Sequence, residues 1–318
     1  MKNKNRWITI LRVIISVILL IIVIKFADID HVVKSLKSFK IIWLLPIFLL
    51  ILLSVIVSAW KWKLLIQAQK VSIRCSLLFI YYNCCLFFNN FLPSSIGGDG
   101  IRIYLAGKKA ADYPAAASSV VMERILATVS LALLGLLSSI FAEHPSKLAV
   151  LLLLFLFIIG TILAYILICG WVPLKVQKRD GKISRAWRKF AVSASELKKH
   201  KKELFYCFFV SLLFQMIVSL VIGAIMKGLS QPLPGLPDLF LITCASSVLA
   251  MVPLGLNGYG MREGAYIFLL KPFGYTASAA LTVSVLFAFF VTAYSLIGGV
   301  NWVLLRSRQR ENKINFNL

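Results

Sequence analysis

The sequence predicts an all-α polytopic membrane protein with about six transmembrane helices and two re-entrant helical hairpins in an inverted repeat. Hydrophobic residues make up 60% of the 318 residues, which is more than a soluble domain of this size carries. Several apolar runs approach or exceed the roughly 20 residues that span the core of a bilayer. Two similar glycine-rich segments interrupt these runs and suggest the hairpins and the repeat.

Six apolar runs are candidates for transmembrane helices. The first, from about Trp7 to Ile24, lacks a small-residue cleavage site before KFADID, so it is predicted to be a membrane anchor. In the second run, Trp60 and Trp62 flank Lys61, which is typical of an aromatic belt at the membrane surface. The other five runs are expected near residues 41–65, 115–141, 147–172, 204–226 and 277–305.

The net charge of +23 is explained by membrane topology and by anionic lipid, because Lys and Arg cluster beside the apolar runs. Nucleic-acid binding is not expected, since a chain embedded in a bilayer has little room for a separate binding module. From Lys175 to Lys202 the chain carries eleven Lys or Arg and only two carboxylates. Residues 173–203 are therefore predicted to form a basic cytoplasmic linker.

The positive-inside rule places both termini and the basic linker on the cytoplasmic side of the cytoplasmic (inner) membrane. Residues 75–112 must then enter and leave from the cytoplasm, and residues 239–272 from the outer side. Their second arms are too short to span, so each is predicted to be a re-entrant hairpin, although Lys271 then lies outside. Residues 1–318 form one membrane domain, with repeats at 73–172 and 204–305.

The two hairpin tips share a motif. The first tip reads PSSIGGDGIR and the second PLGLNGYGMR, which aligns Pro93 with Pro253, Gly98 with Gly258, Gly100 with Gly260 and Arg102 with Arg262. Downstream, YPAAASS at Tyr113 is similar to YTASAAL at Tyr275. Because the tips enter from opposite sides, the repeat is inverted. This arrangement is typical of secondary transporters, which bind substrate near the middle of the membrane.

The tips are predicted to form an anion site. Glycine lets the chain reverse direction, proline ends the incoming helix, and a new half-helix is expected to start near Asp99 and near Tyr259. Each new N-terminus would expose free N–H groups and carry an Arg, which suits a phosphate. The candidate binding residues are Arg102, Arg262, Asp99, Glu123, Glu263, Arg124, Asn257, Gly97, Gly98, Gly100, Gly258 and Gly260, with Pro93 and Pro253 as structural turns.

Other interpretations of the charged residues stay open. Asp99 is also a plausible helix N-cap with Arg102 as its salt partner, and Glu123 is equally well explained as part of a structural ion pair inside the membrane. The cysteines and histidines show no ligand spacing, so no metal site is expected, and the cysteines are interpreted as small buried hydrophobes. No cofactor is expected. ATP hydrolysis is not expected either, because the sequence contains no GxxxxGK[ST] loop.

Four segments resemble the flippase-like, or lysylphosphatidylglycerol-synthase transmembrane-region, family. They are NNFLPSSIGGDGIR at 89–102, ERI at 123–125, VPLGLNGYGMREGA at 252–265 and IGGVNW at 297–302. The resemblance implies an inner-membrane protein related to the lipid-flipping half of bifunctional aminoacyl-phosphatidylglycerol synthase/flippases. The chain stops roughly thirteen residues after the last apolar run, so their soluble lysyl-transferring domain is expected to be absent.

The function expected from the sequence is a lipid flippase or transporter and not an enzyme. It would move a phosphate-containing headgroup of a phospholipid, an aminoacyl-phospholipid or a polyprenyl-phosphate-linked sugar across the membrane. One alternative is an integral-membrane lipid-modifying transferase, although the chain shows no paired His, clustered Asp or GxSxG motif. Another is an accessory membrane scaffold. The expected partners are membrane lipids with anionic headgroups, and homo-oligomerisation stays open.

Overall fold

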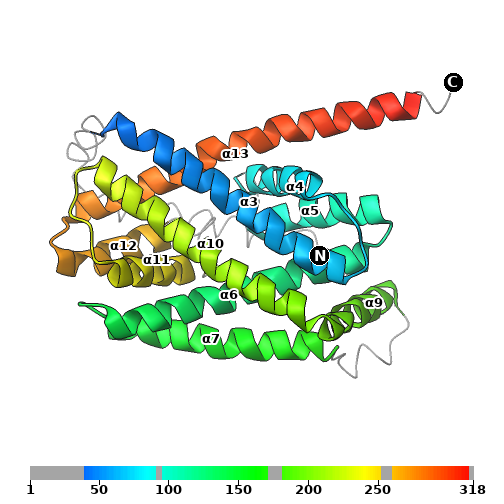
Figure 1. The fold of residues 1–318 in the computed structure, drawn as a ribbon, viewed down its shortest axis with the longest axis horizontal. Coiled ribbons are helices and arrows are strands. Elements are labelled where there is room, and N and C mark those ends of the chain that lie inside the picture. The colour runs from blue at the N-terminus through cyan, green and yellow to red at the C-terminus, as the bar shows by residue number, and fades with distance from the viewer. Residues whose placement is uncertain (1–38, 91–94, 171–180, 252–259, 315–318) are drawn as a thin grey trace, which may run out of the picture. The chain divides into compact units, whose positions relative to one another are not determined.

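A computed structural model describes residues 39–90, 95–170, 181–251 and 260–314 of the chain (Figure 1). Every regular element within these ranges is a helix, and five of the helices are long and apolar enough to cross a membrane. The prediction of an all-α polytopic membrane protein is therefore confirmed. The first predicted run, Trp7 to Ile24, lies outside the described residues.

The five long helices coincide with the five remaining predicted runs. The shortest has 22 residues, or about 33 Å at 1.5 Å per residue, which matches the roughly 30 Å hydrocarbon core. A short 3₁₀ turn, Ile41–Trp43, leads into the first of them. They are α3 (Leu44–Ala68), α6 (Tyr113–Phe141), α7 (Lys147–Ile168), α10 (Lys201–Gly228) and α13 (Ala277–Ile314).

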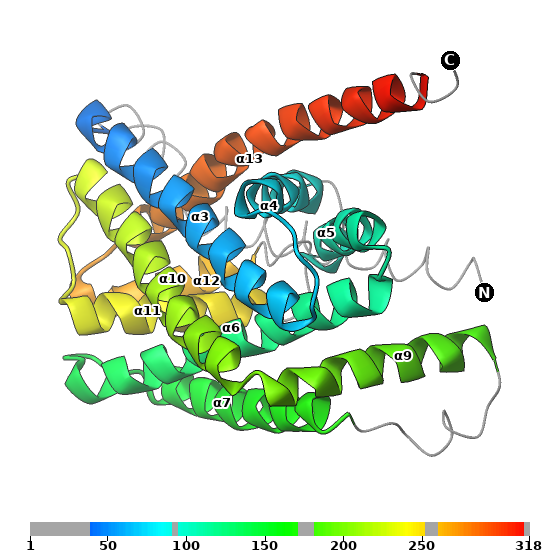
Figure 2. The same ribbon diagram turned by 45° about the vertical axis from the view of Figure 1, so that its right-hand side comes forward.

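Two pairs of shorter helices occupy the predicted hairpins. Helices α4 (Cys75–Asn89) and α5 (Ser95–Ala110) lie side by side, and so do α11 (Leu236–Met251) and α12 (Met261–Leu270) (Figures 1 and 2). The longest of these has 16 residues, about 24 Å, which is too short for the hydrocarbon core. The helical hairpins exist as predicted, whereas their re-entrant placement and inverted orientation stay predictions.

The helices form two compact units, each containing one hairpin. The first-hairpin unit consists of the described parts of Val55–Glu123, Ile166–Cys207 and Thr292–Leu318. The second-hairpin unit consists of the described parts of Met1–Ser54, Arg124–Tyr165 and Phe208–Val291. The long helix that follows each hairpin, α6 or α13, begins in the unit of its own hairpin and ends in the other unit. This pattern is the same for both hairpins.

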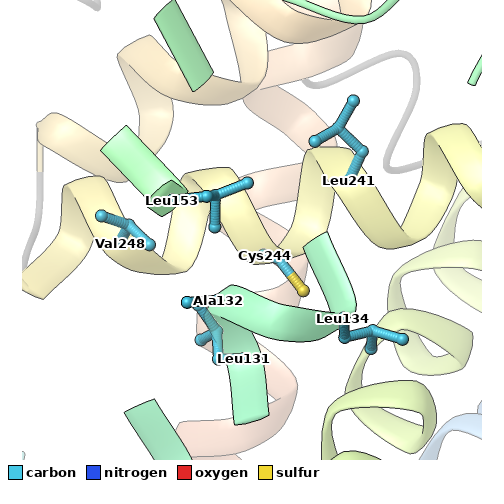
Figure 3. Close-up of a cluster of buried hydrophobic side chains, with 7 residues drawn as sticks. All are labelled: Leu131, Ala132, Leu134, Leu153, Leu241, Cys244 and Val248. Atoms are coloured by element: carbon cyan, nitrogen blue, oxygen red, sulfur yellow. The ribbon is translucent and has the colours of Figure 1, made fainter. Parts of the chain in front are cut away.

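The core of the second-hairpin unit is an apolar cluster where α6, α7 and α11 meet. Gly135 allows this close packing, because a Cβ at that position would lie 2.8 Å from the Leu153 Cδ1 atom and 3.0 Å from the Cys244 Cβ atom. Cys244 therefore behaves as the small buried hydrophobe that the sequence predicts. Figure 3 shows the cluster, which consists of Leu131, Ala132, Leu134, Leu153, Leu241, Cys244 and Val248.

Asp238 connects the start of α11 to the turn between α6 and α7. Its buried carboxylate accepts hydrogen bonds from the backbone N–H groups of Glu143 at 3.1 Å and His144 at 3.2 Å. These bonds satisfy the charge of a carboxylate that would otherwise be expensive to bury. Sequence reasoning did not identify this residue, because an Asp in the first turn of a helix is ordinary.

The basic segment predicted as a linker contains a helix, α9 (Lys182–Glu196), which continues into a 3₁₀ turn, Leu197–Lys199. Ser193 attaches α9 to the first-hairpin unit. Its hydroxyl donates to the Gln69 Oε1 atom at 2.9 Å, its carbonyl accepts from Gln69 Nε2 at 2.8 Å, and Ser118 Oγ lies 3.1 Å from its hydroxyl. This segment is therefore partly a docked amphipathic helix and not only a connection.

Helix α5 begins at Ser95, four residues before the expected start near Asp99. Gly97, Gly98 and Gly100 consequently lie within the helix and do not form the reversal. Position 98 requires glycine for close packing and not for a turn. The Gly98 N–H donates to the Asn89 Oδ1 atom at 3.1 Å, and a Cβ at Gly98 would lie 2.4 Å from the Cys85 carbonyl oxygen. The glycine permits close contact between α4 and α5.

Replacing Gly98 by alanine is expected to destabilise the protein by about 1–3 kcal/mol, because the Cβ would collide with the backbone of α4. The matched control is Gly100→Ala, since a Cβ at Gly100 meets no atom within 4 Å. That change should be neutral or stabilising by up to about 1 kcal/mol. Thermal unfolding in detergent measures both, and equal melting temperatures for the two variants would contradict the packing assigned to Gly98.

Candidate functional site

Four charged side chains from three helices meet in the first-hairpin unit. Lys61 of α3 lies with its Nζ atom 3.0 Å from the Oε1 atom of Glu123 on α6. Arg102 of α5 donates from Nη1 to the other carboxylate oxygen of Glu123, and from Nε to Asp99 Oδ1 at 2.9 Å. Glu123 thus bridges two cations, and Arg102 bridges two carboxylates.

The cluster is almost completely removed from solvent and carries no net charge. The exposed fractions of the side chains are 0% for Arg102, 1% for Glu123, 2% for Lys61 and 13% for Asp99. Two cations face two carboxylates, so each buried charge has an opposite charge in contact. Matching of this kind is required, because an isolated charge at such a position is costly and ionisable residues within membrane helices usually serve a function.

Aromatic rings hold the Arg102 guanidinium on its remaining sides. Its Cζ atom lies 5.2 Å from the ring centroid of Trp62 and 5.1 Å from that of Tyr82. Trp62 is itself fixed by a hydrogen bond from Nε1 to Ser119 Oγ at 3.1 Å. Cation–π attraction therefore adds to the ion pairs and fixes the orientation of the guanidinium.

Sequence reasoning missed Lys61 and Trp62 as members of this cluster. It assigned both to an aromatic belt, whereas Trp62 is fully buried and Lys61 is 2% exposed. Trp60 is 47% exposed, as a belt residue would be. The difference arises because successive residues of a helix point about 100° apart, so neighbours in sequence face different surroundings. The position of Lys61 within an apolar run was the sequence feature that could have indicated a buried charge with a partner.

Asp99 is not the N-cap of α5, since the helix begins at Ser95. Its carboxylate instead accepts from Arg102 and from the thiol of Cys85, whose Sγ atom lies 3.8 Å away. The N-cap interpretation of Asp99 is therefore wrong, although its ion pair with Arg102 is present, and a role of Asp99 in binding stays a prediction. Arg124, next to Glu123, is half-buried and belongs to the second-hairpin unit.

The second motif places its arginine at a helix N-terminus, as predicted. Helix α12 begins at Met261, and Gly260 before it has a φ of 88°, in the left-handed region that favours glycine. The Gly260 N–H donates to the Oε2 atom of Glu263 at 2.6 Å, so this carboxylate occupies the positive end of the helix. Glu263 is 2% exposed, and the neighbouring Arg262 is 15% exposed.

Arg262 is connected to α13 as well as to Glu263. Its Nη2 atom lies 3.1 Å from Glu263 Oε1, and its Nε donates to Ser284 Oγ at 3.2 Å. The Ser284 hydroxyl donates to Glu263 Oε1 at 3.1 Å and closes a triangle of polar contacts. Phe287 packs against the guanidinium, with the Arg262 Cζ atom 5.7 Å from the ring centroid.

The two motif arginines make comparable contacts in their own units. Arg102 reaches a polar side chain 21 residues later on α6, and Arg262 reaches one 22 residues later on α13. Arg102 and Arg262 belong to different units. The other predicted residues of the tips, Pro93, Pro253, Asn257 and Gly258, lie outside the described residues.

The sequence of the chain is similar to those of known membrane proteins. Residues 9–299 match the family model of the lysylphosphatidylglycerol synthase TM region, a match that includes both hairpins. The chain is also similar to the UPF0104 membrane protein MJ1595 of Methanocaldococcus jannaschii. The two are 26% identical over 311 residues, which cover 90% of this chain and 91% of that protein.

The charge balance of the cluster can be tested through Glu123. Glu123→Gln removes the carboxylate shared by Lys61 and Arg102, and is expected to destabilise the protein by about 3–5 kcal/mol. Adding Lys61→Met to this variant removes one of the two cations and should restore at least about 1 kcal/mol. Thermal and denaturant unfolding in detergent provide the measurement. A Glu123→Gln protein as stable as the original would show that the ion pairs are not coupled to folding.

Proposed function

The chain belongs to the family of the lysylphosphatidylglycerol synthase TM region, and we propose that it moves a phosphate-containing lipid headgroup across the cytoplasmic membrane. The observation that carries the proposal is the pair of motif arginines. Each arginine lies in a helical hairpin whose helices are too short to span the hydrocarbon core. Each is paired with a carboxylate and contacts a polar side chain on the long helix that follows its hairpin. Such hairpins form substrate sites in secondary transporters.

In this proposal Arg262 is the first ligand of the phosphate. It lies in the first turn of α12, where the helix dipole and the backbone N–H groups favour an anion, and it retains partial exposure. Glu263 now occupies this position through its contact with the Gly260 N–H. An arriving phosphate would replace the carboxylate at Gly260, while Glu263 keeps the hydroxyl of Ser284 as a donor.

Arg102 takes part by exchanging partners. In the described conformation its guanidinium contacts Asp99 and Glu123, so a phosphate must displace one of them. Lys61 makes that exchange feasible, because it already contacts Glu123 and would keep this carboxylate neutralised when Arg102 turns to the phosphate. The carboxylates thus hold the cations in place between transport events and prevent an unmatched buried charge.

The remaining steps of the proposal concern the acyl chains and the movement of the two hairpins. The acyl chains stay in the bilayer while the headgroup passes the two hairpins, each of which is open to one side of the membrane in turn. Helices α6 and α13 each contribute residues to both units, and in this proposal they transmit the movement of one hairpin to the other. We place the termini in the cytoplasm, as the distribution of Lys and Arg favours.

Replacing Arg262 by alanine is expected to lower the rate of headgroup movement at least about tenfold, because the phosphate loses a bidentate donor. Arg262→Lys should recover only part of the rate, since it keeps the charge and loses the planar fork. The rate is measured in proteoliposomes with phospholipids carrying a fluorescent headgroup that an external reductant bleaches.

Arg306→Ala is the matched control, because Arg306 is exposed on α13 and stacks on Trp302. It removes the same charge and should leave the rate unchanged. Full transport by Arg262→Ala would contradict the proposal. New lipid species detected by mass spectrometry, with unchanged distribution between leaflets, would favour a lipid-modifying transferase instead.

A further inference from the structure

Helix α9 and the beginning of α6 line a groove that takes no part in the proposed transport. Its volume is about 870 Å³, within the range of small-molecule and lipid pockets. The groove lies within the first-hairpin unit. Helix α9, which follows α7 and precedes α10 in the sequence, is labelled in Figure 2. The apolar part of its lining includes Ile103, Pro114, Ala117, Val121, Trp187 and Phe190.

The groove combines this apolar lining with two cations. Arg185 and Lys189, one turn apart on α9, both line it and are both exposed. Trp187 lies between them in sequence, is 44% exposed, and packs on Phe190 with ring centroids 5.6 Å apart. A soluble anion would gain nothing from the apolar surface, and a neutral lipid would gain nothing from the cations.

Helix α9 is fixed in place and has the pattern of a membrane-surface helix. Ala191, Ala194 and Leu197 are buried against the unit, and Ser193 is hydrogen-bonded to Gln69. The outward side carries Arg185, Lys189 and Val192, which is 63% exposed. Trp187 lies on the same helix face as Ala191 and Ala194, is 44% exposed and lines the groove. A basic amphipathic helix with aromatic and aliphatic residues beside the charges typically lies at the headgroup level of a bilayer.

We propose that this groove binds one anionic phospholipid, with an acyl chain along the apolar lining and the phosphate between Arg185 and Lys189. Charge complementarity selects this occupant: Lys175 to Lys202 carries eleven cations and two carboxylates, and one of these, Glu196, is paired with Lys199 at 2.8 Å. The site would anchor α9 to the cytoplasmic leaflet. It uses none of the candidate phosphate-binding residues and does not depend on the proposed function.

Quenching of Trp187 by brominated lipid tests the proposal. The full chain is placed in nanodiscs of phosphatidylcholine, and phosphatidylglycerol with dibrominated acyl chains is titrated in. The signal of Trp187 is the difference between the original protein and Trp187→Phe, which removes the contributions of the other tryptophans. We expect half-maximal quenching at a mole fraction about tenfold lower for brominated phosphatidylglycerol than for brominated phosphatidylcholine.

Two charge reversals with the same change in net charge provide the control. Arg185→Glu with Lys189→Glu should abolish the preference for phosphatidylglycerol. Lys201→Glu with Lys202→Glu reverses two exposed lysines outside the groove lining and should change the preference by less than about twofold. A third variant, Ala117→Phe, fills the groove without adding a tryptophan and should weaken quenching while leaving every charge in place.

The proposal is overturned by equal quenching from the two lipids, by no quenching attributable to Trp187, or by equal effects of the two charge reversals. The last result would indicate diffuse attraction to the membrane surface in place of a site. Unchanged quenching in a folded Ala117→Phe protein would show that the acyl chain lies elsewhere. Retention of the gel-filtration profile confirms that each variant is folded.

Discussion

The first-hairpin unit depends on the ion pairs that the Glu123 carboxylate makes. This carboxylate contacts Lys61 and Arg102 from two other helices, in surroundings from which water is almost excluded. In such a place an unmatched charge costs several kcal/mol, so three helices must come together at this point for the charges to be matched. The polar contacts therefore determine where the helices meet, whereas apolar packing alone would allow many arrangements in a lipid environment.

The second-hairpin unit also neutralises the charge of its motif arginine, with one carboxylate. Arg262 and Glu263 neutralise each other, and Ser284 contributes a hydroxyl from α13. The carboxylate reaches the N–H of Gly260, so the positive end of α12 is also satisfied. One hairpin thus holds its arginine deep in a balanced cluster, and the other holds it at a helix terminus. Under the proposed function, this asymmetry would correspond to one state of the transport cycle.

Length and hydrophobicity were sufficient to predict the five long helices, because a bilayer imposes its thickness on any helix that crosses it. The hairpins were predicted from the distribution of Lys and Arg and from the repeated glycine motif. The contacts of Lys61 and the start of α5 at Ser95 were not predictable, since they depend on which helix faces lie together. The glycine motif correctly indicated a special backbone conformation at Gly260, which has a φ of 88° immediately before α12. At Gly98 the same residue type serves close helix packing instead, and a sequence pattern does not distinguish the two uses.

The most direct test of the account is a measurement of contact between Arg262 and a lipid phosphate. Solid-state NMR of the full chain in anionic nanodiscs, with ¹⁵N-labelled arginine, detects dipolar coupling between guanidinium nitrogens and the ³¹P of bound lipid. The account predicts that Arg262→Lys removes the Arg262 contribution to this coupling, that any contribution of Arg185 in the α9 groove remains, and that Arg306→Ala leaves both in place. A spectrum that Arg262→Lys leaves unchanged would contradict it, because the phosphate would then not reach the tip of the second hairpin.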